Sequence, residues 1–180
     1  LRSIGTILGP VRPILRAIRA VGAVDSANAD WIEVDCRSID WNRDVVLVGD
    51  PGLARSILAN AANTRSCCRS TGDDFSASTQ ELFDAVAAQC RSQGYRVVRI
   101  PVVPGIDSRT FITYVNVLID SQQGKQIVYL PIYAHTPELN AAAGEIWRGL
   151  RYEVRPIDCS NAYVHFGSLR CLVNVIRRHS

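Results

Sequence analysis

Apolar and polar residues follow two different periods along this chain, and the two periods alternate. Short runs rich in β-branched and aromatic residues, bounded by turn-forming residues, predict strands. These runs occupy residues 31–39, 44–50, 95–103, 110–120, 126–133 and 152–159, and runs of the same character follow at 162–167 and 169–178. The polar SQQGK segment at 121–125 predicts a tight turn between two of the strands.

Apolar residues spaced three and four positions apart predict four helices. The first spans 9–22, with its arginines on the opposite, solvated face, and a loop at 23–30 follows it. Two more are predicted at 51–62 and 137–150. The remaining helix ends before Gly94. Its apolar face is formed by Leu82, Phe83, Val86 and Cys90.

The order of these elements repeats along the chain. A strand–strand–helix–strand unit occurs twice between residues 31 and 159, and the last two apolar runs begin a third copy. Repetition at this length predicts modules that pack around a shared axis, which makes the fold class α/β. The equivalent positions of the three first strands hold Asp35, Asn116 and Cys171, so we expect these side chains to converge on one site.

Composition narrows the class of protein. With 47% apolar and 21% charged residues, the chain is expected to fold as a domain with a real core. No stretch approaches the ~20 uninterrupted apolar residues of a membrane helix, so no membrane partner is expected. The net charge of +3 and the lack of a basic arm argue against a nucleic-acid partner. Because the chain starts at Leu1 and contains no methionine, we expect a processed or excised piece of a longer chain.

The cysteines raise the central question of the sequence. None of the six has the C-x-x-C spacing of a zinc site, and only three histidines are available, so the sequence predicts no metal and no cofactor. Cys171 differs from the others because it opens an apolar run shortly after Gly167 and directly follows Arg170. Three interpretations of Cys171 remain open: a buried small hydrophobe, half of a disulfide, and a nucleophile.

Two stretches of the chain resemble a known superfamily. The C-terminal one reads RTFITYVNVLID…QIVYLPIY…LNAAAGEIW…YEVRPIDCSNAYVHFGSLRCLVNVIRR, and the upstream one reads EVDCRSIDWNRDVVLVGDP. They resemble the guanidino-group-modifying superfamily, and within it the agmatine deiminases and peptidylarginine deiminases. The C-x-x-N-V-x-R-R stretch that begins at Cys171 looks particularly like peptidylarginine deiminases.

This resemblance implies a fold and an activity. The fold is a fan of ββαβ modules, the α/β-propeller or pentein type, which is incomplete or shortened here because full members have five modules. Residues 1–30 would form an N-terminal helix and loop, and 31–180 the deiminase-like domain. The activity is cysteine-dependent hydrolysis of a guanidinium group through a covalent cysteine adduct, with protein arginine converted to citrulline as the expected reaction.

The resemblance also assigns roles to individual residues. Cys171 matches the nucleophile, and Asp35 matches the aspartate of a His-x-Asp motif that grips the guanidinium. The WNRD sequence at 41–44 is similar to a Trp-x-Arg-Asp motif, which makes Asp44 a second candidate for binding the guanidinium. Asn116 is expected either to orient the substrate or to hydrogen-bond within the sheet.

Two positions depart from the family pattern. Glu33 stands where the family has its acid–base histidine, and it transfers protons near neutrality only if its pKa is raised. Arg170 replaces the histidine that precedes the nucleophile. It is a candidate for substrate binding, and its positive charge favours a thiolate. His165, six residues before Cys171, is the alternative base. The missing histidine leaves a second interpretation open, a catalytically inactive binding module.

Expected partners follow from the resemblance. The substrate is an arginine-containing protein or a small guanidine. Deiminase-like domains also occur as toxin domains of secreted bacterial proteins, so an immunity protein, or the remainder of a longer chain, is a further expected partner. Both a secreted effector and a cytoplasmic protein fit the sequence, which leaves the localisation open.

Overall fold

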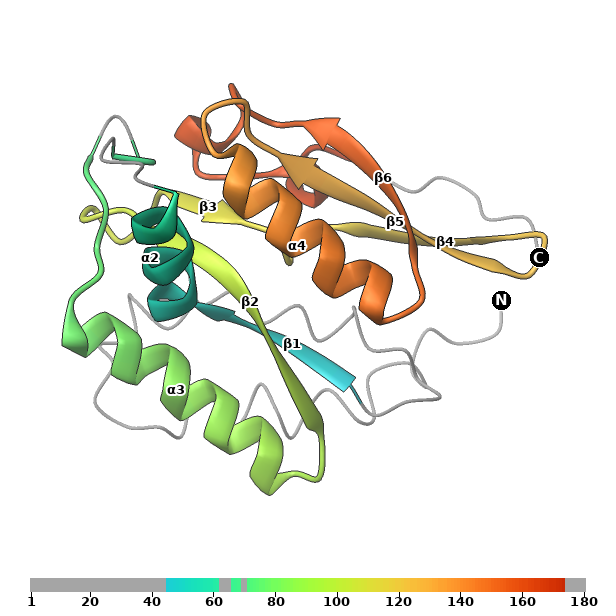
Figure 1. The fold of residues 1–180 in the computed structure, drawn as a ribbon, viewed down its shortest axis with the longest axis horizontal. Coiled ribbons are helices and arrows are strands. Elements are labelled where there is room, and N and C mark those ends of the chain that lie inside the picture. Colours follow the sequence, from blue (N-terminus) through green and yellow to red (C-terminus); the bar gives the residue numbers. More distant parts are fainter. Residues whose placement is uncertain (1–44, 62–65, 69–70, 174–180) are drawn as a thin grey trace, which may run out of the picture.

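A computed structural model of the chain describes residues 45–61, 66–68 and 71–173. This part is a mixed α/β structure with two three-stranded sheets and three α-helices (Figure 1). The strands are β1 Val45–Asp50, β2 Arg96–Pro104, β3 Phe111–Thr113, β4 Leu118–Gln122, β5 Lys125–Ile132 and β6 Glu153–Asp158. The helices are α2 Pro51–Asn60, α3 Ala77–Ser92 and α4 Pro137–Gly149, followed by the short 3₁₀ helices η3 Tyr163–His165 and η4 Leu169–Leu172.

The first sheet has the order β1-β2-β3. β1 and β2 are parallel, with Val46 opposite Val97, and β3 runs antiparallel to β2, with Ile112 opposite Val103. Val45–Val48 are almost completely buried, as expected for a parallel strand that is covered on both faces. The sequence prediction of strands at 44–50 and 95–103 is therefore confirmed.

The second sheet has the order β4-β5-β6. β4 and β5 form a hairpin through Gln123 and Gly124, which both have positive φ, and this is the turn that the SQQGK segment predicted. β5 and β6 are parallel and are joined through α4. The strand–strand–helix–strand order therefore holds for 118–158, whereas the arrangement of several such units around an axis stays a prediction.

The predicted strand 110–120 is interrupted. β3 pairs with β2 and β4 pairs with β5, so the stretch between them passes from one sheet to the other. The interruption covers 114–117, where Tyr114 and Asn116 are buried. The carbonyl of Tyr114 accepts a hydrogen bond from the indole Nε1 of Trp147, a residue of α4, at 3.1 Å. Asn116 therefore lies at the junction of the two sheets.

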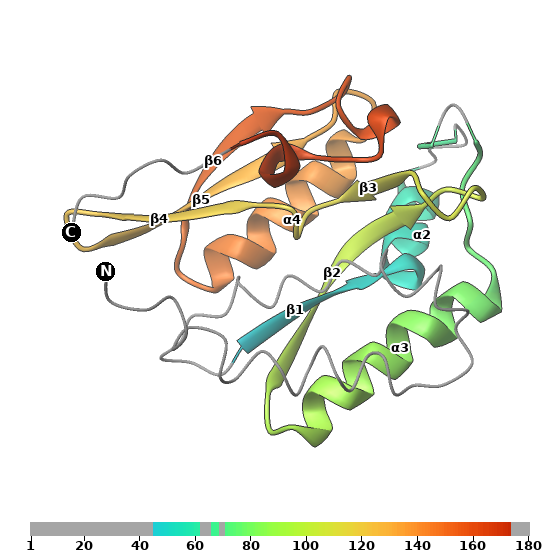
Figure 2. The same ribbon diagram turned by 180° about the vertical axis from the view of Figure 1, so that it is seen from behind.

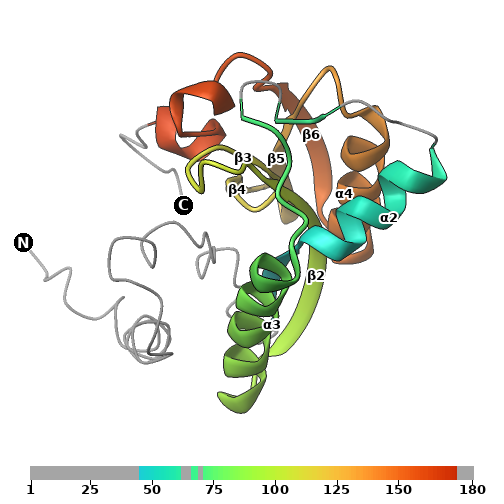
Figure 3. The ribbon, with the colours of Figure 1, turned by 90° about the vertical axis from the view of Figure 1, so that its left-hand side faces the viewer.

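One hydrophobic core joins both sheets. Its largest fully buried side chains are Trp147, Tyr114 and Tyr133, and the same cluster includes residues of β1, α2, β5 and α4. α2 and α4 lie side by side over this core (Figure 3). α3 packs on β1 and β2 through a smaller cluster that includes Val46, Val86 and Cys90.

The three predicted helices in the described part are confirmed, and their starts have local causes. The Asp50 side chain accepts a hydrogen bond from the Leu53 N–H at 3.0 Å, while Pro51 occupies the first turn of α2. Ser76 caps α3 in the same way, and α3 ends just before Gly94, whose φ is +89°. The helix and loop expected at 1–30, and the strand expected at 31–39, lie outside the described residues.

The prediction of strands after residue 160 is wrong for the described residues. The run at 162–167 contains η3, and the run that begins at Leu169 forms η4, so neither is extended. Phe166, between them, has a φ of +63°, a left-handed conformation outside the β region. Ser168 is buried and bonded to Tyr133, which holds the chain in turns. Residues 174–178 of the expected strand lie outside the described residues.

No helix in the described ranges is long and apolar enough to cross a membrane.

Candidate functional site

The candidate nucleophile lies on a short turn and not on a strand. The backbone N–H of Cys171 donates to the carbonyl of Ser168 at 3.0 Å and closes η4. Cys171 is exposed, and its thiol is free. η4 lies on the face of the β4–β6 sheet opposite α4, near the bend between β3 and β4 (Figure 2). Of the three interpretations of Cys171, the structure therefore excludes the buried hydrophobe, and within the described residues it shows no disulfide.

Asn116 connects the sheet junction to this turn. Its Nδ2 donates a hydrogen bond to Sγ of Cys171 at 3.2 Å. Its Oδ1 accepts a hydrogen bond from the backbone N–H of Arg170 at 2.7 Å. Asn116 is only 2% exposed, so both contacts are made by a side chain whose position is fixed by packing. The structure thus brings together three of the predicted residues, Asn116, Arg170 and Cys171.

The start of the turn is anchored from β5. The hydroxyl of Tyr133, just after β5, donates to the carbonyl of Thr113 at 2.9 Å. The same hydroxyl lies 3.0 Å from Oγ of Ser168, the residue before η4. All three residues are buried, and Tyr133 also packs edge-to-face on Tyr163 at 5.7 Å between ring centroids. Polar contacts in a dry environment of this kind fix the conformation of a turn.

Gly167 lies close to the side chain of Cys171. A Cβ atom at this position would stand 3.2 Å from Cβ and 3.8 Å from Sγ of Cys171. Because the first distance is tighter than an ordinary van der Waals contact, a larger residue here would push the Cys171 side chain away. The glycine therefore permits the close return of the chain that presents the thiol.

The remaining described cysteines are held in a state that disfavours reaction. Burial, followed by the charge of Asp73, raises the pKa of Cys67 and of Cys68 to about 12. Burial also raises the pKa of Cys90 and of Cys159. All four are buried, whereas Cys171 is exposed. Within the described residues, Cys171 is therefore the cysteine that solvent and a substrate can reach.

Several large apolar side chains close to Cys171 in the sequence are exposed to solvent. They belong to η3, η4 and the residues beside these helices: Val164, Phe166, Leu172 and Val173. Together with Arg170, whose exposure is intermediate, they give the turn a mixed apolar and cationic surface.

The two histidines of the described region are not bonded to Cys171. His165 is exposed at the end of η3, and none of the hydrogen bonds or ion pairs among the described residues involves its imidazole. His135 is directed elsewhere, because its Nε2 lies 2.9 Å from the carbonyl oxygen of Cys67. The predicted role of His165 as a base therefore stays a prediction. Glu33, Asp35 and Asp44 lie outside the described residues.

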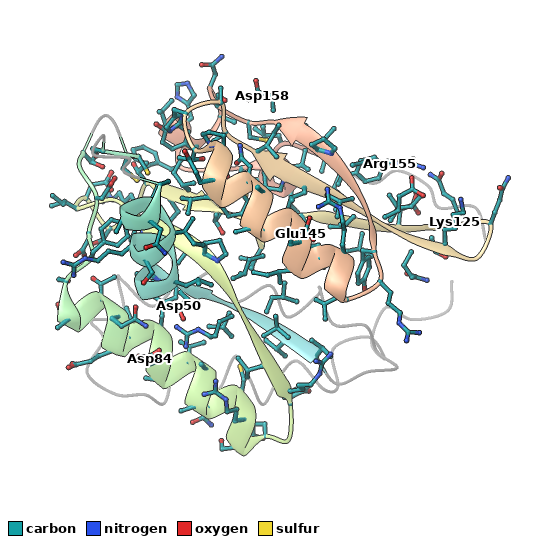
Figure 4. All side chains as sticks on the ribbon, in the orientation of Figure 1. Asp50, Asp84, Lys125, Glu145, Arg155 and Asp158 are labelled. Carbon is teal, nitrogen blue, oxygen red and sulfur yellow. The ribbon has the colours of Figure 1, made fainter. Side chains whose placement is uncertain are left out.

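Charged side chains elsewhere are engaged in ion pairs. Arg99 of β2 bridges Asp50 at 3.2 Å and Asp84 of α3 at 2.8 Å, and the two acids lie on neighbouring elements (Figure 4). Arg155 pairs with Glu153 along β6. No group of three or more histidine, cysteine, aspartate or glutamate side chains that could hold a metal ion occurs in 45–61, 66–68 or 71–173.

Two residues of the site were missed by the sequence analysis. Tyr133 and Ser168 anchor the turn, but the sequence marks them only as the end of an apolar run and a polar residue after a glycine. Their 35-residue separation gives no periodic signal. The pair becomes visible only when β5 and η4 are packed together.

The chain was compared with known protein families, curated proteins and solved structures. No protein-family model matches the chain, and neither a curated protein nor a solved structure matches it.

Proposed function

We propose that this chain is a cysteine-dependent hydrolase of the guanidino-group-modifying type, which converts the guanidinium of protein arginine into the ureido group of citrulline. The observation that carries the proposal is the state of Cys171. It is an exposed thiol on a fixed turn, and a buried amide donates a hydrogen bond to its sulfur. A hydrogen-bond donor at sulfur stabilises the thiolate, which is the form that attacks carbon.

The proposed reaction consists of two substitutions at one carbon. The thiolate of Cys171 attacks the guanidinium carbon, the carbon–nitrogen bond to a terminal nitrogen breaks, and ammonia leaves after taking up a proton. Water then attacks the thiouronium adduct, and the carbon–sulfur bond breaks to return the thiolate. The sum is guanidinium plus water giving a ureido group plus ammonium, without an oxidant or a cofactor.

Carboxylates and a proton carrier complete this proposal. Asp35 and Asp44 would hold the planar guanidinium through paired hydrogen bonds, as the resemblance implies. Glu33 or His165 would transfer the protons. The finer fold proposal, a shortened fan of ββαβ modules, would place Asp35 beside Asn116 and Cys171 at a common axis. The strand–strand–helix–strand order of 118–158 supports it.

Citrulline formation tests the activity directly. The full chain is incubated with an arginine-rich protein and, separately, with a small acylated arginine and with agmatine, and ureido groups are detected by colour reaction and by the mass increase of about 1 Da. Activity that is lost in Cys171→Ser, but kept in the buried-cysteine variant Cys90→Ala, supports the proposal. A folded protein with a reactive Cys171 and no product from any of the three substrates refutes it.

One observation favours a second function, a catalytically inactive binding module. Among the described residues, the sulfur of Cys171 has a neutral amide as its partner, and no carboxylate or imidazole is bonded to it. A haloacetamidine, which mimics a guanidinium and alkylates cysteines beside guanidinium sites, separates the two functions. If the probe labels Cys171 selectively and free arginine slows this labelling, the result supports the enzyme. Arginine-peptide binding without labelling supports the binding module.

A further inference from the structure

The orientation of the Asn116 side chain is fixed by its chemistry. The backbone N–H of Arg170 can only donate, so the atom of Asn116 that faces it at 2.7 Å must be the carbonyl oxygen. The other terminal atom of the side chain, which lies 3.2 Å from Sγ of Cys171, is therefore the amide nitrogen. Since an NH₂ group can only donate, the sulfur must be the acceptor.

We infer that Asn116 is a positioning residue that holds the sulfur of Cys171 in its anionic, attacking form by donating an amide hydrogen bond to it. The inference rests on the proposed role of Cys171 as a nucleophile, but it gives Asn116 a role different from the predicted one in substrate binding. The 2% exposure of Asn116 supports this role, because a side chain that is almost fully covered by protein offers little surface to a substrate.

The two hydrogen bonds act together on one turn. The Arg170 N–H belongs to η4, and so does Cys171. If η4 shifts, both contacts of Asn116 change at once, so the amide sets the distance between the thiol and the junction of the two sheets. Tyr133 holds the start of the same turn through Ser168, which leaves the thiol little freedom to move away from Asn116.

The substitution Asn116→Asp tests the donor. Aspartate has the shape of asparagine and keeps an oxygen acceptor for the Arg170 N–H, but it replaces the donor at sulfur by an anion. A like charge at this distance disfavours the thiolate. We expect the rate of Cys171 alkylation by iodoacetamide, measured at about pH 7 in a Cys36→Ser background, to fall at least about tenfold.

A pH series separates stabilisation of the anion from simple access. Because ordinary cysteine thiols are largely ionised at about pH 10.5, we expect the alkylation rates of wild type and Asn116→Asp to approach each other there to within about twofold. Arg170, His165 and Arg177, the ionisable side chains closest to Cys171 in the sequence, are present in every variant. A matched control, Asn60→Asp at the exposed end of α2, makes the same change in net charge and should leave both rates unchanged.

The uncharged variant Asn116→Leu is measured beside Asn116→Asp, because it removes the donor without adding a charge that by itself disfavours the thiolate. Circular dichroism checks that each variant folds. Slower alkylation that is confined to neutral pH supports the inference. Equal rates in wild type and variant at both pH values, or an equal loss at both, overturn it. Because alkylation requires no substrate, this outcome is independent of citrulline formation: a wild type that alkylates as expected but makes no citrulline refutes only the proposed function.

Discussion

The hydroxyl of Tyr133 lies 3.0 Å from Oγ of Ser168, and both groups are buried. The same hydroxyl donates to the carbonyl of Thr113 at 2.9 Å, so the proton at the second contact comes from Ser168. One phenol therefore ties the end of β3 and the start of the Cys171 turn to the end of β5. Removing it would leave buried polar groups of Thr113 and Ser168 without this partner, which has a cost in stability.

The first prediction concerns Tyr133→Phe. We expect the free energy of unfolding to fall by about 1–3 kcal/mol, because the hydroxyl that bonds Thr113 and Ser168 is lost while the ring remains. Urea denaturation followed by fluorescence measures it. Tyr129→Phe is the matched control, because the Tyr129 hydroxyl accepts a long, 3.4 Å contact from Arg155 and the residue is half-buried. An equal loss in both variants would contradict a special role for Tyr133.

Gly167→Ala is expected to slow the reaction of Cys171 without unfolding the protein. The new Cβ would stand 3.2 Å from the Cys171 Cβ, so the cysteine must move from its place beside Asn116. We expect alkylation at neutral pH to slow at least about threefold, with a loss of stability below about 1.5 kcal/mol because the crowding is local. Gly149→Ala, whose new Cβ would meet no atom within 4 Å outside its chain neighbours and its own helix backbone, should leave the alkylation rate unchanged. Unaltered alkylation in Gly167→Ala would show that the turn adapts freely.

Gly49→Ala should destabilise the first sheet. A Cβ on Gly49 would meet Cγ1 of Val102 at 2.7 Å and Cε1 of Phe83 at 2.9 Å. Since these atoms belong to β2 and α3, both elements must move away from Gly49 in β1. We expect the free energy of unfolding, measured by urea denaturation, to fall by about 1–3 kcal/mol. Wild-type stability in this variant would mean that α3 packs less tightly on the sheet than the structure indicates.

The pH dependence of stability should include a contribution from Asp107. Partial burial raises the pKa of Asp107, but the hydrogen bonds from Thr110 and Arg109 outweigh it, so the pKa is lower in the folded protein. A lowered folded pKa stabilises the fold above the pKa of the unfolded chain, and this stabilisation is lost as the pH falls through the folded value. The contribution is small, below about 1 kcal/mol, because the group is largely exposed.

The substitution Asp107→Asn isolates this contribution. At neutral pH the variant should be less stable than the wild type, because its amide cannot serve all the donors of the Asp107 loop equally well. The difference in unfolding free energy should shrink between about pH 5 and pH 3, since the wild type loses its carboxylate contribution there. Glu81→Gln on the exposed face of α3 is the control. A difference that stays constant with pH would exclude Asp107 as the titrating group.

The sequence by itself determined the elements that depend on local chemistry. Pro51 after the Asp50 cap set the start of α2, and the polar segment around Gly124 set the β4–β5 hairpin, because caps and turns act within a few residues. Cys171 was singled out from Gly167 and Arg170, which lie close to it in the sequence, and its role as a nucleophile came from the family resemblance.

Tertiary structure alone decided the form of the site. The apolar residues after Ser168 suggested a strand, but their β propensity was overridden when Tyr133 bonded Ser168 and the chain closed into η4. Asn116 looked like one polar residue within a strand. Packing of the sheet junction against the turn turned its amide towards the sulfur, a contact between residues 55 positions apart that no local pattern encodes.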